Sequence, residues 1–156
     1  MKIKNIYVTI CLIILFLFVN RAWTADWTLL ASYAGGEMSY FLSTIKSEKE
    51  KVVPVWTKTV FNEKGKADTL SYLKSKDKGV SPAGTLSYNL ILYEMDCLNG
   101  KYRTSASYYY DDEKDNLIFS EKNAQNEFFD ILPDTILEKL KNTVCRCVSN
   151  AGMQKK

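Results

Sequence analysis

Two alternating segments on either side of Asn99-Gly100 constrain the fold more than any other feature of the sequence. Residues 85–97 place apolar side chains at every second position, with Leu86, Tyr88, Leu90 and Leu92 on one face. Residues 101–110 alternate in the same way and place Tyr102, Thr104, Ala106, Tyr108 and Tyr110 on one face. A period of two is typical of β-strands, and Asn-Gly is the strongest signal for a short hairpin turn. The pattern predicts an antiparallel hairpin within a larger sheet.

Four further segments have the composition of strands, which gives about six strands in all. They are residues 27–33, 38–45, 52–61 and 116–120, and Gly35-Gly36 separates the first two with a turn signal. Residues 62–84 are rich in Lys, Asp, Ser and Gly and contain few apolar side chains. We predict a long exposed connection there, with room for one helical turn.

One helix is expected at the C-terminus. Pro133 precedes Asp134 and Thr135, either of which can cap a helix, and Glu138 has the spacing of a capping box from Thr135. The apolar stripe of this helix consists of Ile136, Leu137, Leu140 and Val144, and Gly152 ends it. The sequence therefore predicts an α+β fold, a single antiparallel sheet of about six strands with the C-terminal helix packed on one face.

The first 25 residues have the pattern of an export signal. Lys2 and Lys4 precede an apolar run over residues 6–19, and a polar stretch with small residues follows. Cleavage is expected after Ala25, with Ala22 as the alternative. An uncleaved anchor is the other interpretation, but the run would span only about 21 Å of a ~30 Å hydrocarbon core. We expect a signal peptide over residues 1–25, a domain over residues 26–156, no membrane span after cleavage, and a periplasmic, secreted or cell-surface location.

Charge and cysteine content narrow the classes of function. Residues 26–156 carry 18 basic and 18 acidic side chains, which gives no reason to expect nucleic acid as a partner. In an oxidising compartment, Cys97, Cys145 and Cys147 would form one disulfide and leave one thiol. Helical periodicity favours Cys147 as the partner of Cys97, because Cys147 continues the apolar stripe. The chain has no His, which removes the commonest metal ligand and general base, and we expect neither a metal nor a cofactor.

The chain resembles the surface-adhesin protein E family of exported bacterial proteins. The matching stretches are residues 38–45, Asp96-Cys97 with residues 101–103, residues 108–111, and residues 132–135 with Cys145. The resemblance implies a six-stranded antiparallel sheet with a C-terminal helix tied to it by a Cys97–Cys145 disulfide. On this ground we expect Cys145, and not Cys147, as the partner of Cys97. It also implies adhesion to host matrix proteins such as laminin and vitronectin, together with haem binding and homodimerisation. Without His, only Tyr, Met, Cys or Lys could ligate haem iron, so haem is not expected here.

We therefore expect a protein-binding module of the bacterial envelope or medium and not an enzyme. The candidate binding face contains Tyr102, Tyr108 and Tyr110, because tyrosine is enriched at interfaces. A structural or assembly subunit of the envelope is one alternative. A small periplasmic enzyme is the other, with Glu94 and Asp96 or residues 111–113 as acid and base, although these carboxylates fit turn and edge positions better.

Overall fold

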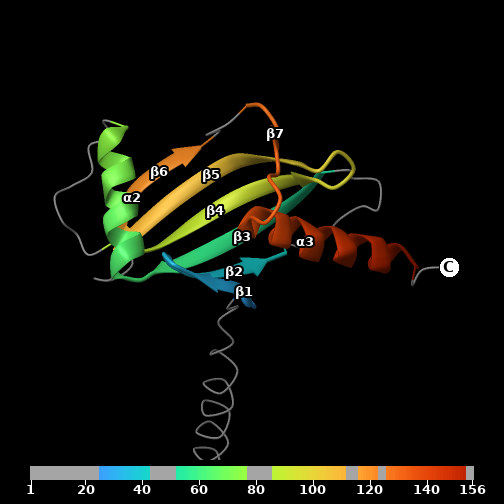
Figure 1. The fold of residues 1–156 in the computed structure, drawn as a ribbon, viewed down its shortest axis with the longest axis horizontal. Coiled ribbons are helices and arrows are strands. Elements are labelled where there is room, and N and C mark those ends of the chain that lie inside the picture. Colours follow the sequence, from blue (N-terminus) through green and yellow to red (C-terminus); the bar gives the residue numbers. More distant parts are fainter. Residues whose placement is uncertain (1–24, 43–51, 77–85, 112–115, 123–125, 154–156) are drawn as a thin grey trace, which may run out of the picture.

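A computed structural model describes residues 25–42, 52–76, 86–111, 116–122 and 126–153, with side chains described as far as residue 146. The described chain contains a seven-stranded sheet and two helices (Figure 1). The elements are β1 (Thr28–Tyr33), β2 (Gly36–Phe41), β3 (Val52–Phe61), α2 (Glu63–Ser75), β4 (Leu86–Asp96), β5 (Lys101–Asp111), β6 (Leu117–Lys122), β7 (Phe129–Asp130) and α3 (Ile136–Met153).

The sheet is an antiparallel meander in the order β1-β2-β3-β4-β5-β6, and the short β7 pairs with the start of β5. The hairpin predicted at Asn99-Gly100 joins β4 to β5. Asp96 shapes its turn, because its carboxylate accepts hydrogen bonds from the backbone N–H groups of Leu98 and Asn99. Gly100 has a φ of 68°, a conformation that costs glycine little. The α+β fold with six meandering strands is confirmed, and β7 is an addition to it.

Alternation along β3 divides the sheet into two faces. Val53, Val55, Thr57 and Thr59 are almost fully buried, whereas the residues between them are half-buried. The buried set points toward both helices, and we call this side the helix face. The opposite side, which we call the open face, carries Phe41 of β2, Trp56 and Lys58 of β3, Tyr88, Leu90 and Leu92 of β4, and Tyr108 and Tyr110 of β5.

Helix α3 lies across one end of the helix face, where its apolar stripe completes the main core (Figure 1). Leu140 and Val144 are fully buried against Leu30, Met38, Val53, Val55 and Met95. The predicted capping by Thr135 is present, and the return bond of Glu138 is shifted by one residue, to Asp134. The Thr135 hydroxyl accepts from the Glu138 N–H, and the Glu138 carboxylate accepts from the Asp134 N–H. A disulfide between Cys97 and Cys145 ties the helix to the turn that follows β4.

The disulfide decides between the two partners that the sequence offered to Cys97. Helical periodicity taken alone favoured Cys147, but the pairing expected from the family resemblance, Cys97 with Cys145, is confirmed. Cys97 lies just beyond the end of β4 at the margin of the core, half-buried. It therefore meets the flank of the apolar stripe at Cys145, next to Val144, and not the centre of the stripe. The side chain of Cys147 lies outside the described residues.

The connection predicted over residues 62–84 contains a helix of 13 residues, α2, so the expectation of a mostly irregular segment is wrong. Asn62 caps it by accepting a hydrogen bond from the Gly65 N–H. Leu70 and Leu73, one turn apart, join Leu86 and Tyr109 in a second, smaller core. Gly65 packs directly on the backbone of Gly35, so α2 lies across the end of the sheet opposite to α3 (Figure 1).

Two expectations concern residues outside the described chain. The proposed signal peptide lies outside the described residues except for Ala25, and so do residues 77–84 of the predicted connection. Of the helices that the structure describes, neither has the length and apolar composition of a membrane span.

Candidate functional site

The open face brings together aromatic rings from four strands. Trp56 on β3 and Tyr108 on β5 reach toward each other over β4, with 6.1 Å between their ring centroids. Leu90 and Leu92 of β4 lie between them in the strand register and form an apolar floor. The result is an apolar surface, half-exposed to solvent, on a rigid sheet.

Two further ring pairs extend this surface. Tyr88 and Tyr110 are cross-strand neighbours whose rings stack with centroids 4.9 Å apart. Trp27, which precedes β1, packs against Phe41 of β2 at 6.0 Å. Because Tyr88 and Tyr110 use their flat faces on one another, this pair presents mainly edges and apolar stems to solvent. Neither described helix packs on this side of the sheet.

Two charged groups on the open face have defined contacts within the protein. The ammonium of Lys58 lies 4.3 Å from the centroid of the Tyr88 ring, a cation–π contact. At the other end of β4, the Glu94 carboxylate accepts two hydrogen bonds from Arg103, at 2.9 and 2.6 Å, and one from Ser105 at 2.6 Å. The guanidinium of Arg103 also lies over the ring of Phe128 at 4.9 Å. The charges of Glu94 and Arg103 are therefore already paired with each other within the protein.

A family model, described as surface-adhesin protein E, matches residues 27–146. The chain belongs to the surface-adhesin protein E family. Comparison with curated proteins gave no match, and comparison with solved structures gave none either. Membership of this adhesin family indicates a cell-surface or secreted protein that binds other proteins and has a non-enzymatic role.

The three tyrosines that were expected on one face of this adhesin-family domain lie on two different faces of the sheet. Tyr108 and Tyr110 lie on the open face, next to Trp56 and Tyr88 respectively. Tyr102 lies on the helix face, where it packs against the main core and Tyr93. The cause is an irregularity in the pairing of β4 with β5. Leu92 pairs with Ala106 but Tyr93 pairs with Thr104, so Ser105 is an extra residue that shifts the alternation. The expectation of a single face is therefore wrong for Tyr102.

Sequence reasoning missed Trp56, Lys58 and Tyr88 as members of the site. A signal for the first two was available, because they alternate with the buried residues of β3 and so had to lie on the second face. The meeting of Trp56 with Tyr108 could not be predicted in this way, since it depends on the register of three strands.

The carboxylates considered for an acid–base pair have structural partners. Glu94 is paired with Arg103, as described above, and Asp96 shapes the turn after β4. Asp111 accepts hydrogen bonds from the backbone N–H and the side-chain amide of Asn116, which link the end of β5 to the residue before β6. Asp112 and Glu113 lie outside the described residues. Among the described residues, no three His, Cys, Asp or Glu side chains are grouped as a metal site would require.

The described sulfur-containing side chains are not placed to ligate the haem that the family resemblance implies. The sulfurs of Cys97 and Cys145 are joined in the disulfide. Met38 and Met95 are buried in the main core beneath α3. Thiolate and thioether ligands are therefore not presented to a bound macrocycle, and no chemistry is derived through haem.

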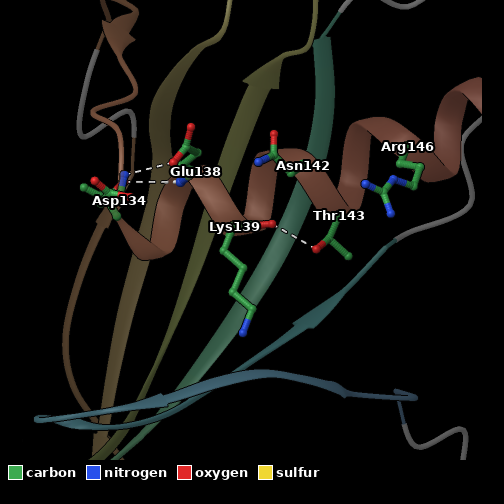
Figure 2. Close-up of a pocket in the computed structure, with 7 residues that line it drawn as sticks. Asp134, Glu138, Lys139, Asn142, Thr143 and Arg146 are labelled. Carbon is green, nitrogen blue, oxygen red and sulfur yellow. Dashed lines mark hydrogen bonds between the residues drawn. The ribbon is translucent and has the colours of Figure 1, made fainter.

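A shallow depression of about 530 Å³ lies along the outer side of α3 (Figure 2). Its lining contains two acidic and two basic side chains, and Figure 2 shows Lys139 on one side of the helix and Glu138 and Asn142 on the other. The side chains of Glu138 and Thr135 are engaged in capping α3. The lining groups do not converge on one point, so the open face is the better candidate for a binding site.

Proposed function

We propose that this protein is an exported adhesin-type module that binds a partner protein through the open face of its sheet. The observation that carries the proposal is the contact of Trp56 with Tyr108 over the apolar floor of β4. Large aromatic side chains on a rigid support lose little entropy on binding and dominate the energy of protein interfaces. Family membership supports a binding role, and the open face supplies a surface suited to it.

The orientation of the rings favours a protein over a sugar or a nucleic acid. Sugars and bases bind aromatic residues by stacking on exposed flat faces. Here Tyr88 and Tyr110 stack on each other, and Lys58 lies over Tyr88. The edges and apolar stems that remain suit interdigitation with the side chains of a protein surface. The equal numbers of acidic and basic residues after residue 25 also disfavour nucleic acid.

Host matrix proteins are the proposed partners, and the proposal is tested with immobilised laminin and vitronectin. The exported protein should bind at least one of them. A Trp56→Ser/Tyr108→Ser variant should bind about tenfold or more weakly, because it removes both central anchors. The control is Tyr72→Ser, which removes an exposed tyrosine of α2 that is not on the open face. Equal losses in the variant and the control, or failure of the native protein to bind either matrix protein, would contradict the proposal.

Export is part of the proposed function. The support is the pattern of residues 1–25, with two lysines, an apolar run and a short polar segment. N-terminal sequencing of protein recovered from the periplasm, medium or cell surface should begin after Ala22 or Ala25. An intact Met1 in the membrane fraction would show instead that the segment is retained as an anchor.

A further inference from the structure

The open face contains a cation without an acidic partner close to its aromatic centre. Lys58 lies on β3, an interior strand, and is half-buried. Its direct neighbours across the strands are Ser39 and Leu90, neither of which is charged. Within the part of the chain that the structure describes, no carboxylate forms an ion pair with Lys58. The Lys58 ammonium instead makes a cation–π contact, 4.3 Å from the centroid of the Tyr88 ring.

From this arrangement, and resting on the proposed function, we infer that the partner protein places a carboxylate against Lys58 within an otherwise apolar contact surface. A partner that covers Trp56 and Tyr108 would also remove water from the neighbouring lysine. A charge that loses its water without gaining a counter-charge weakens binding strongly, whereas a matching carboxylate restores the balance and selects the partner. Lys58 would then determine specificity while the aromatic rings supply apolar contact.

The other cations of the open face do not have this property. Arg103 forms an ion pair with Glu94 and lies over the ring of Phe128, so its charge already has a partner within the protein. Lys122 is exposed at the end of β6, so its ammonium stays hydrated when a partner covers the centre of the open face. Lys58 is therefore the group at which the charge of the partner matters most.

A protein carboxylate suits this site better than an anionic membrane. Membrane surfaces are recognised by clusters of several Lys and Arg side chains, each contributing to the attraction. Near the centre of the open face the described residues include one such cation, Lys58, which is flanked by apolar or aromatic side chains at Trp56, Leu90 and Tyr88. Its diagonal neighbour on β2, Glu37, accepts a hydrogen bond from the Ser32 hydroxyl. This pattern corresponds to a single acidic side chain flanked by apolar ones.

The experiment uses the exported protein and three capped peptides that differ at one position. Each peptide has two apolar residues on either side of a central aspartate, asparagine or lysine. The aspartate peptide should bind about tenfold or more tightly than the asparagine peptide, and the lysine peptide should bind most weakly. NMR titration should locate the perturbed backbone amides on β3, β4 and β5. Two further measurements test other occupants of the open face. Binding of the protein to phosphatidylglycerol vesicles tests an anionic membrane, and sedimentation of the protein alone tests self-association.

Substitutions at Lys58 separate charge from packing. Lys58→Met keeps the apolar stem and should abolish the preference for aspartate, while Lys58→Arg should keep it. An unchanged preference in Lys58→Met would overturn the inference. So would equal affinity for the three peptides, absence of binding to all of them, vesicle binding that depends on Lys58, or self-association that covers the open face. If the Trp56→Ser/Tyr108→Ser variant loses matrix binding and Lys58→Met does not alter the peptide preference, the inference fails and the proposed function stands.

Discussion

Cys97 and Cys145 join the turn after β4 to the second half of α3, with 5.6 Å between their Cα atoms. The two residues are 48 positions apart in the chain. The bond thus spans β5, β6 and β7 and holds the helix against the strands that carry its core contacts.

Removal of this disulfide should destabilise the domain severely. Closing a loop of this length contributes about 4 kcal/mol in the chain-entropy model, a large part of the stability of a small domain. A Cys97→Ala/Cys145→Ala variant should lose about this amount in urea unfolding. Dithiothreitol should destabilise the native protein and leave the variant unchanged. If the variant and the native protein unfold at the same urea concentration, α3 is held by packing alone.

Substitution of Gly65 should reverse the usual effect of Gly→Ala in a helix. Alanine normally stabilises a helix interior by up to about 1 kcal/mol relative to glycine. At Gly65 the added Cβ would overlap the carbonyl oxygen of Gly35, which is backbone and cannot move aside easily. We expect Gly65→Ala to lower the free energy of unfolding by about 1–3 kcal/mol. The matched control is Ser71→Ala at an exposed position of α2, which should be neutral or slightly stabilising. A stabilised Gly65→Ala protein would mean that α2 does not pack on Gly35.

Stability should fall at alkaline pH through Tyr93. Burial, followed by the tyrosines Tyr109, Tyr102 and Tyr33, raises the pKa of the Tyr93 hydroxyl well above the ordinary tyrosine value of about 10. The unfolded chain therefore loses this proton first as the pH rises, so the stabilisation is complete below about pH 10 and decreases above it. Tyr93→Phe should flatten the alkaline part of the stability curve measured from about pH 8 to about pH 11. Burial also raises the pKa of Tyr109, so some decline should persist. An equally steep curve for Tyr93→Phe would assign the effect to other groups.

Tyr102 and Tyr108 should differ in what they contribute to stability. Tyr102 packs between Tyr93 and Phe129 on the helix face, at 6.0 and 6.4 Å between ring centroids. Tyr102→Ser should therefore lower the free energy of unfolding by about 2 kcal/mol. Tyr108 lies on the open face, and Tyr108→Ser should cost less than about 1 kcal/mol. Urea unfolding of the two variants measures the difference, and the reverse order would contradict the placement of the two rings on opposite faces.

Local sequence patterns were sufficient to predict several elements of the fold. The period of two along β3, β4 and β5, the Asn99-Gly100 turn and the capping box at Thr135 each predicted the element that is present. A strand or a capped helix is specified by residues close together in the chain, because backbone geometry fixes which side chains share a face. The family resemblance added the pairing of Cys97 with Cys145, which the local pattern of α3 did not favour.

Tertiary structure decided the features that depend on how distant segments meet. Ser105 is an extra residue in the pairing of β4 with β5, and it shifts Tyr102 to the helix face. The alternation of residues within β5 alone does not show where such a shift occurs. Helix α2 has a narrow apolar stripe, and its place depends on the contact of Gly65 with Gly35. The meeting of Trp56 with Tyr108 across β4 requires the register of three strands. Cross-strand hydrogen bonding sets that register, so the candidate site formed only when the sheet was assembled.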